Sequence, residues 1–219
     1  MIVSIKQILP PGETADVRAT LEEIAFVDGR ATAGWSAKLV KSNRQAAPGH
    51  VLDALRSRVA ERILSNPLFA LAVRPKALTL LTFARYHPGD AYGAHVDDAL
   101  MGGLRTDVAF TLFLSDANSC DGGELVIESP AGEDTIKLDA GSLVAYPATT
   151  LHRVQPVTRG ERLVAVGWAR SLIRSAEQRE LLFDLDTARR ALFQREGKTR
   201  DGDLLAKCAA NLMRMWAED

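Results

Sequence analysis

A series of short apolar runs between residues 78 and 169 is the feature that most restricts the fold of this 219-residue chain. The runs cover residues 78–86, 107–115, 124–128, 134–138, 142–146 and 162–169. Turn sequences such as Pro88-Gly89-Asp90 and Asp121-Gly122-Gly123 separate them. Several short strands with turn residues at this spacing are typical of a β-sandwich or barrel. We therefore expect a core of the jelly-roll type, a double-stranded β-helix.

Two helices are expected before this β region. Apolar side chains recur at helical spacing in residues 14–26, and again from Pro48 to about Asn66. The residues expected on the inner faces of these helices are Val17, Leu21, Ile24 and Ala25, then Val51, Leu55, Val59 and Ile63. Residues 28–47 are rich in small and polar side chains, which indicates a loop or an irregular edge strand.

The chain returns to helix after Arg170. Ser175-Ala-Glu-Gln178 has the pattern of a capping box, in which a hydroxyl and an amide satisfy backbone N–H groups at the start of a helix. A second helix is expected from about Asp203 to Trp216, and the expected inner stripe of the first is Leu181, Leu182, Leu185, Ala188 and Leu192. The predicted class is α+β, with N-terminal supporting helices and a small C-terminal helical appendage; the predicted units are residues 1–174 and 175–219.

Composition excludes several classes of protein. Hydrophobic residues make up 47% and charged residues 25% of the chain, as in ordinary globular proteins. A formal net charge of -1 gives no overall attraction to nucleic acid or to anionic membranes, and no apolar run is long enough for a membrane span. Two isolated cysteines, Cys120 and Cys208, fit a reducing compartment, so we expect a cytoplasmic protein without nucleic-acid or membrane partners.

The pair His95 and Asp97 is the first candidate for metal binding. On an extended segment, side chains two positions apart point to the same side, so both could face one ion. With 28 acidic residues in the chain, however, such pairs arise often by chance. Taken alone, the pair fits polar residues at the end of a strand equally well.

His152 strengthens the metal hypothesis. It follows the expected strand at 142–146 and the Tyr146-Pro147 break, where a side chain can be presented at the mouth of a barrel. Two imidazoles and one carboxylate form the facial triad of non-haem Fe(II) oxygenases, which leaves three coordination positions open. A structural zinc site would need a fourth ligand, and none lies near these positions in the sequence. His50 and His87 are expected to be solvated residues in loops or turns.

Arg162 distinguishes between kinds of metal site. The run 162–169 places it on one face of a strand with Val164, Val166 and Trp168. A buried cation on this apolar face needs an anion, and guanidinium matches a carboxylate with two parallel hydrogen bonds. A salt bridge to an acidic residue of the protein, or exposure at the end of the strand, are alternatives that the strand alone leaves open.

These residues also resemble a known signature. Arg85-Tyr86-His-Pro-Gly89-Asp-Ala-Tyr92-Gly-Ala-His95-Val-Asp97 looks like the Tyr-x-x-Gly-x-x-Tyr-x-x-His-x-Asp motif of prolyl-4-hydroxylase-like Fe(II)/2-oxoglutarate dioxygenases, and His152 with Arg162 matches its second half. Residues 1–195 resemble the bacterial PKHD-type hydroxylases more closely. The segments that carry this resemblance include His95-Val-Asp-Asp98, Arg105-Thr-Asp107, Asp121-Gly-Gly-Glu-Leu-Val-Ile-Glu128, Pro156-Val-Thr-Arg-Gly160 and Leu181-Leu-Phe-Asp-Leu-Asp186.

The resemblance implies a role for individual residues. His95, Asp97 and His152 would bind Fe(II), and Arg162 would hold the distal carboxylate of 2-oxoglutarate. Further candidates to line the co-substrate site are Tyr86, Tyr92, Trp168 and Thr111. The implied enzyme is a 2-oxoglutarate-dependent dioxygenase that hydroxylates an amino acid, peptide or small molecule, uses dioxygen, and releases succinate and CO2. Ascorbate would keep the iron reduced.

Two other hypotheses remain open at this stage. A non-catalytic iron- or ligand-binding jelly-roll module linked to iron homeostasis would explain the triad but not Arg162. A cupin-type metalloenzyme that uses no 2-oxoglutarate usually has more histidines than the four present here. The sequence names neither the primary substrate nor the oligomeric state. Residues 28–47 and 98–106 are expected to determine substrate specificity and could close as lids. Asp98 and Arg105, in the second segment, are expected either to contact substrate or to form a solvated pair.

Overall fold

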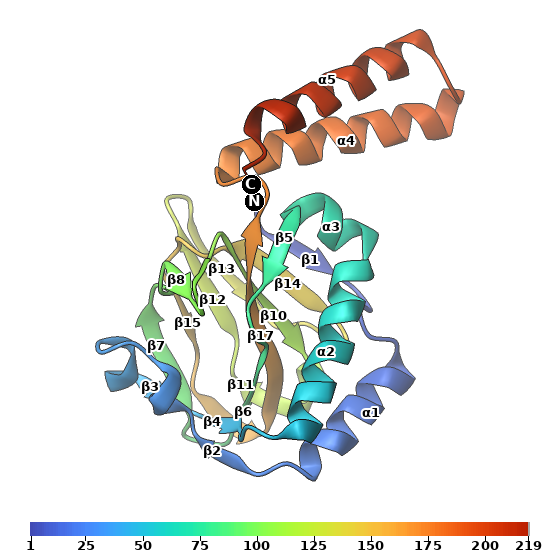
Figure 1. The fold of residues 1–219 in the computed structure, drawn as a ribbon. Coiled ribbons are helices and arrows are strands. Elements are labelled where there is room, and N and C mark those ends of the chain that lie inside the picture. The colour runs from blue at the N-terminus through green and yellow to red at the C-terminus, as the bar shows by residue number, and fades with distance from the viewer. Residues whose placement is uncertain (219) are drawn as a thin grey trace.

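The computed structural model describes residues 1–218 and shows two antiparallel sheets that face each other (Figure 1). The larger sheet has the strand order β1-β14-β10-β17-β6-β4-β2, with β5 also paired to β17. Its strands are β1 (Val3–Ile5), β14 (Leu143–Pro147), β10 (Val108–Phe113), β17 (Arg162–Ser171), β6 (Thr82–Tyr86), β4 (Arg44–Ala46), β2 (Phe26–Asp28) and β5 (Pro75–Leu78).

The smaller sheet completes the jelly roll and has the order β13-β12-β15-β7-β3. Its strands are β13 (Gly132–Ile136), β12 (Leu125–Ser129), β15 (His152–Val154), β7 (Ala91–His95) and β3 (Lys41–Ser42). Two further sheets are short two-stranded ribbons: β8 (Leu100–Met101) with β9 (Leu104–Arg105), and β11 (Cys120–Gly122) with β16 (Val157–Gly160). Single turns of 3-10 helix are η1 (Gly29–Thr32), η2 (Ala37–Leu39) and η3 (Ala117–Ser119).

Both faces of the larger sheet are buried, and β17 shows why. Its alternation sends Leu163 and Ala165 into a core beneath the helices, while Val164 lies in a second core between the sheets. Val166 and Trp168 pack against that second core, on the side that also carries the buried Arg162. The predicted face of this strand, with an arginine among apolar residues, is therefore confirmed.

Three helices cover the outer face of the larger sheet (Figure 1). They are α1 (Pro11–Glu22), α2 (His50–Ser65) and α3 (Pro67–Val73). Helix α1 thus begins and ends earlier than the expected 14–26, and in α2 the expected inward Val51 is 55% exposed while Leu52 is buried. Helix α3 is not expected from the sequence, in which Asn66-Pro67 indicates the end of the preceding helix. Asn66 instead caps a new helix, accepting hydrogen bonds from the N–H groups of Leu68 and Phe69 at 3.0 Å.

Several strands were also missed or merged. The run 78–86 is divided between β5 and β6, which both pair with β17. Strands β7 and β15 carry the candidate histidines but were not predicted as strands. Each is short and lacks a long apolar run, so only its neighbours in the sheet identify it.

Helices α4 (Ala176–Glu196) and α5 (Arg200–Trp216) form a hairpin that projects from the β core (Figure 1). Ser175 caps α4 by accepting a hydrogen bond from the Gln178 N–H at 3.2 Å. The expected stripe is partly wrong: Leu182 is buried, but Leu181 is 52% exposed and Ala188 is also exposed. A buried ion pair between Arg74 and Asp186, at 2.6 Å, joins the hairpin to the core instead.

No helix within residues 1–218 is long and apolar enough to cross a membrane. The expected boundary lies between residues 174 and 175, directly before Ser175, which caps α4. Residue 219 of the expected second unit lies outside the described residues. The division into two units remains a prediction.

The two cores lead to a stability prediction. Leu112→Ala removes a fully buried side chain beneath the helices, so it should lower the free energy of unfolding by about 2–5 kcal/mol. Leu181→Ala, the matched control on the exposed side of α4, should change it by less than about 0.5 kcal/mol. Urea unfolding followed by circular dichroism measures both; equal effects would contradict the observed packing.

Candidate metal centre

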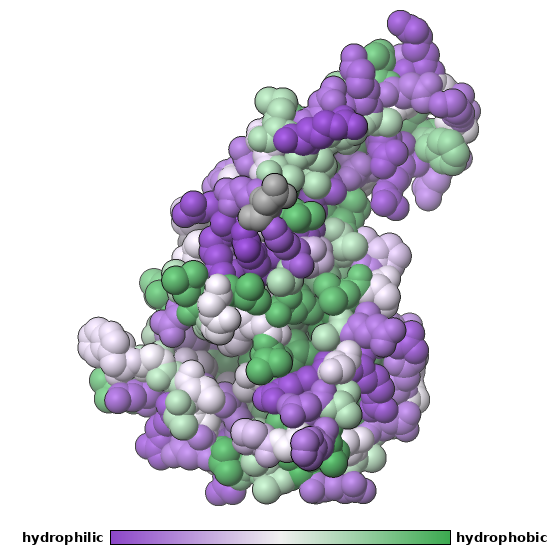
Figure 2. Space-filling view, in the orientation of Figure 1, coloured by the Kyte–Doolittle hydropathy of each residue, from purple (hydrophilic) through white to green (hydrophobic). Residues whose placement is uncertain are grey.

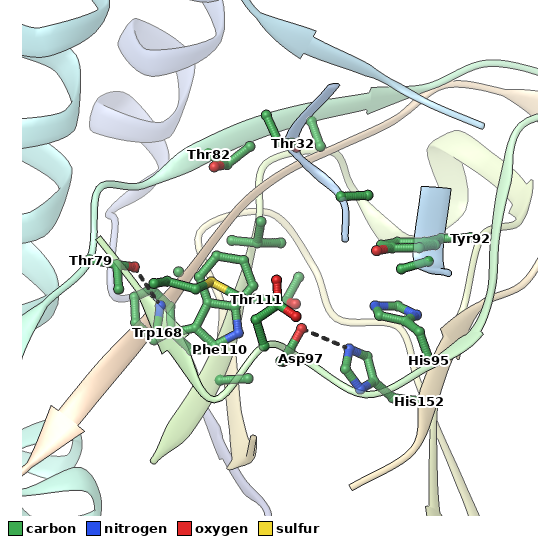
Figure 3. A pocket seen from close by; sticks show the side chains of 18 of the residues that line it. Thr32, Thr79, Thr82, Tyr92, His95, Asp97, Phe110, Thr111, His152 and Trp168 are labelled. Atoms are coloured by element: carbon green, nitrogen blue, oxygen red, sulfur yellow. Dashed lines mark hydrogen bonds and ion pairs between the residues drawn. The ribbon is translucent and has the colours of Figure 1, made fainter. Parts of the chain in front are cut away.

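His95, Asp97 and His152 come together at one end of the smaller sheet (Figure 3). His95 ends β7 and His152 begins β15, and the antiparallel pairing of these strands sets the two residues opposite each other. Their ring centroids lie 4.3 Å apart, and His152 Nε2 lies 3.7 Å from Asp97 Oδ1. One potential ligand atom from each of the three residues lies within 4.8 Å of those of the others.

Main-chain carbonyl groups orient both imidazoles. His95 Nδ1 donates to the Gly93 oxygen at 2.8 Å, and His152 Nδ1 donates to the Thr150 oxygen at 3.1 Å, when the rings are in the tautomer protonated at Nδ1. This tautomer leaves each Nε2 with a free lone pair, as a metal ligand requires. The sequence did not reveal these acceptors, each of which lies two residues before its histidine.

The electrostatics of the three residues favour a bound cation. Burial lowers the pKa of His95 to about 4, with a further contribution from the neighbouring His152, so the imidazole is neutral at pH 7. Burial also raises the pKa of Asp97, whose Oδ2 has no hydrogen-bond partner. Because a divalent cation would stabilise the carboxylate and accept both imidazoles, the three residues fit an Fe(II) ion bound on one face.

No further His, Cys, Asp or Glu of residues 1–218 joins this group. The group therefore lacks the fourth protein ligand that closes a structural zinc site. Its open side faces a cavity of about 650 Å³, which is of the size that takes small molecules. A metal ion on the triad would be accessible to ligands from this cavity.

Arg162 lines the same cavity and is only 3% exposed. Its Nε and Nη1 have no hydrogen-bond partner, and its guanidinium lies 5.0 Å from the Tyr86 ring and 5.6 Å from the Phe113 ring. Burial lowers its pKa, but a guanidinium stays charged in proteins. Neither alternative from the sequence holds: Arg162 is not exposed, and it forms no salt bridge within residues 1–218. A carboxylate entering the cavity would satisfy it.

Gly123 makes room for this arginine. A Cβ atom at residue 123 would lie 2.9 Å from Arg162 Cδ, and the φ angle of +71° favours glycine as well. The turn Asp121-Gly122-Gly123, which marked a break between strands in the sequence, therefore also sets the position of the guanidinium.

The other predicted residues also line the cavity: Tyr86, Tyr92, Thr111 and Trp168. The Tyr92 ring stacks on His95 with centroids 3.6 Å apart, while Thr111 and Trp168 lie on the other side of Asp97 (Figure 3). The structure thus brings together every site residue proposed from the sequence, although their contacts with co-substrate remain predictions.

Sequence reasoning missed Tyr146 and Lys41, which also line the cavity. Tyr146 is 4% exposed, and its ring lies edge-on to His152 with centroids 5.2 Å apart. Burial raises its pKa well above the ordinary value. Its position before Pro147 at the end of an apolar strand was a usable signal. Lys41 gave none, because residues 28–47 were expected to form a loop or an irregular edge strand, and neither expectation singles out one lysine as buried.

The remaining candidates lie outside the site. His50 begins α2, and His87 is 46% exposed and 3.7 Å from Glu161. Arg105 does not pair with Asp98 as one alternative proposed; it binds Asp107 and Glu218, at 2.7 and 2.6 Å. Asp98 lines the cavity, as do parts of both expected lid segments, Thr32 and Gly34 from one and Leu100 and Leu104 from the other.

Comparisons with known proteins show the family of this chain. Residues 81–170 match the family model described as "2OG-Fe(II) oxygenase superfamily", and residues 177–218 match "PKHD-type hydroxylase C-terminal domain". The chain is 52% identical to a PKHD-type hydroxylase of Picosynechococcus sp. and 49% identical to one of Maricaulis maris, each over 100% of both chains. The fold and the three clustered residues are those of an Fe(II)- and 2-oxoglutarate-dependent oxygenase. Within that class, the chain belongs to the PKHD-type hydroxylases, and is therefore an oxidoreductase.

Solved structures support the fold. A Pseudomonas putida prolyl-4-hydroxylase has a TM-score of 0.53 at 24% identity, with 78% of this chain and 92% of that chain covered. HygX of Streptomyces hygroscopicus, solved with nickel, 2-oxoglutarate and hygromycin B bound, has a TM-score of 0.56 at 16% identity, with 78% and 84% covered. The expected α+β jelly-roll class is thereby confirmed.

The lowered pKa of His95 predicts a pH effect in the metal-free protein. Between pH 6.5 and 4 the unfolded chain binds a proton at this residue and the folded chain does not, so stability falls as the pH falls through this range. The expected contribution is about 1–3 kcal/mol. An NMR titration of His95 should show a midpoint near 4, and His95→Asn should show a smaller loss of stability on acidification. A midpoint near 6.5 would contradict the burial of this ring.

Proposed function

We propose that His95, Asp97 and His152 hold Fe(II), that Arg162 holds the distal carboxylate of 2-oxoglutarate, and that the enzyme hydroxylates a small molecule, amino acid or peptide. The observation that carries the proposal is the buried, unpaired guanidinium of Arg162 in the cavity that also receives the triad. A protein that only binds a metal would not need the buried cation Arg162 in the same cavity. A dicarboxylate co-substrate does need it, because the guanidinium pairs with the second carboxylate.

Each side chain has a distinct task in this mechanism. When bound, Fe(II) and 2-oxoglutarate supply the oxidising chemistry, in which dioxygen is consumed, the keto acid yields succinate and CO2, and the substrate gains a hydroxyl group. The triad orients the metal from one side and leaves the cavity side open. Arg162 fixes one end of the co-substrate, while Tyr86, Thr111 and Trp168 exclude water around it.

Tyr92 and Tyr146 support the histidines rather than the metal directly. Tyr92 stacks on His95, and Tyr146 packs edge-on against His152. With the carbonyl acceptors behind each Nδ1, these rings restrict both imidazoles to one orientation. Their tasks are therefore geometric, and their removal should weaken metal binding less than removal of a ligand.

We also propose that ascorbate sustains turnover by returning oxidised iron to Fe(II), that residues 1–174 form the catalytic unit and that residues 175–219 form an accessory helical unit. The two unpaired cysteines, Cys120 and Cys208, support a reducing, cytoplasmic location.

The metal assignment predicts that His152→Ala abolishes Fe(II) binding and 2-oxoglutarate-dependent succinate formation. His87→Ala is the matched control, since His87 is half exposed and lies outside the triad, and it should bind metal like the wild type. Anaerobic calorimetry with Fe(II) measures binding directly. Metal binding that survives in His152→Ala with unchanged affinity would exclude this site.

The co-substrate assignment predicts that Arg162→Ala weakens 2-oxoglutarate binding to the metal-loaded protein by about 100-fold or more, because two charge-assisted hydrogen bonds are lost. Arg162→Lys should be intermediate, since it keeps the charge but not the paired N–H groups. Arg159→Ala, which removes a surface arginine that pairs with Asp121, is the control. Calorimetry should show wild-type affinity in the control and the loss in Arg162→Ala; equal affinities would refute the role of Arg162.

A further inference from the structure

Lys41 is a second buried cation in the cavity and has no role in the function proposed above. It belongs to β3, at the edge of the smaller sheet, where it pairs with Tyr92 of β7. It is 8% exposed, and its Nζ lies 5.0 Å from the centre of the Tyr92 ring, whose own stacking partner is His95. The ammonium group is therefore close to the metal site, on a different sheet from Arg162.

The hydrogen bonding of Lys41 is incomplete. Nζ donates to Thr32 Oγ1 at 3.2 Å, and that hydroxyl in turn donates to Gln45 Oε1 at 2.8 Å. No carboxylate of residues 1–218 forms a salt bridge with Nζ; the nearby Asp28 is held by Arg30 at 2.7 Å, and Asp97 belongs to the triad. An ammonium has three donors, so Lys41 keeps donors without a protein acceptor and a positive charge without a salt bridge.

A bound anion would stabilise the buried ammonium group of Lys41. Burial lowers the pKa of Lys41 to about 8, against the opposite influence of Asp28 and Asp97, so the side chain is still mainly charged at neutral pH. A buried charge without a counter-ion is costly unless a ligand supplies one. The proposed function already places 2-oxoglutarate at Arg162 and on the open side of the triad, which leaves Lys41 for a different molecule.

The mouth of the cavity indicates what else that molecule contains. Leu80, Val96 and Leu100 line the cavity yet are 75%, 51% and 68% exposed. They come from three separate segments, and Figure 2 shows hydrophobic residues gathered in a band across this face, from β8 toward β5. Exposed apolar groups that converge on a cavity mark a binding surface for an apolar group.

We propose that Lys41 binds the carboxylate of the primary substrate, and that this substrate is a small molecule whose apolar body lies against Leu80, Val96 and Leu100. The cavity volume of about 650 Å³ favours a small molecule. The assignment rests on the proposed function, because it takes the metal and Arg162 as the sites of 2-oxoglutarate. It makes Lys41 a specificity-determining residue, which selects acids over neutral analogues of the same shape.

Calorimetry with octanoate and octanamide tests this assignment, since the two probes share an apolar chain and differ in charge. The protein is loaded with Zn(II), which supports no oxidation, and saturated with 2-oxoglutarate. The wild type should bind octanoate about tenfold more tightly than octanamide. Lys41→Met keeps the length of the side chain and should lose this preference, while Lys41→Arg should retain part of it.

Lys38→Met is the matched control, because Lys38 lies in the same segment but is exposed, and it should keep the wild-type preference. The absence of an acid preference in the wild type, whether both probes bind or neither does, would overturn the proposal. A preference for octanoate that persists in Lys41→Met would also overturn the proposal, and so would displacement of 2-oxoglutarate by octanoate. If the proposed function is wrong, 2-oxoglutarate does not bind in the first titration. The affinities of octanoate and octanamide for the wild type and for Lys41→Met can still be compared in that case.

Discussion

The antiparallel pairing of β7 with β15 is the constraint on which the site depends. It sets His95 opposite His152, and Asp97 follows His95 closely enough to complete the group. The same pairing brings Gly93 and Thr150 into position, so that backbone carbonyls orient both rings. Because strand pairing is a property of backbone hydrogen bonds, side chains from two distant parts of the chain are held in one arrangement.

The cavity concentrates charges that the fold alone leaves unsatisfied. Asp97 has an oxygen without a hydrogen-bond partner, Arg162 has two such nitrogens, and Lys41 forms no salt bridge with a carboxylate of residues 1–218. Each is unfavourable in the free protein, because buried charges need partners. A cation, a dicarboxylate and a further anion would satisfy them in turn. In this view, ligand binding stabilises the folded protein, as expected for any molecule that binds only the native state.

The helical hairpin and the mouth of the cavity are connected through charged residues. Arg105, at the end of the β8–β9 ribbon, binds both Asp107 and Glu218, while Arg179 of α4 donates to the Asp107 main-chain oxygen at 3.4 Å. The residues next to Arg105, including Leu104, line the cavity. The C-terminal helical hairpin is therefore attached to the segment in which specificity was expected.

Sequence and structure agree where burial is extensive. Strands β10 and β17 were predictable because both faces are apolar, and Arg162 stood out as a charge within such a run. Strands β7 and β15 were not, since they are short and mixed in polarity, and their conformation depends on neighbours that are remote in sequence. Helix α3 was missed for a local reason, because Asn66-Pro67 can end one helix or begin another.

By itself, the sequence determined the class of fold, the metal-binding triad as a candidate and Arg162 as a candidate to bind an anion, because these follow from side-chain chemistry and from the period of a strand. Only the tertiary structure decided that Arg162 forms no salt bridge within residues 1–218, that main-chain carbonyls orient the histidines, and that Tyr146 and Lys41 share the cavity. The physical reason is that burial and pairing are properties of the assembled sheets. Lys41 illustrates this: in the sequence it is one of 27 basic residues, and it becomes a candidate binding residue because the fold buries it without a counter-ion.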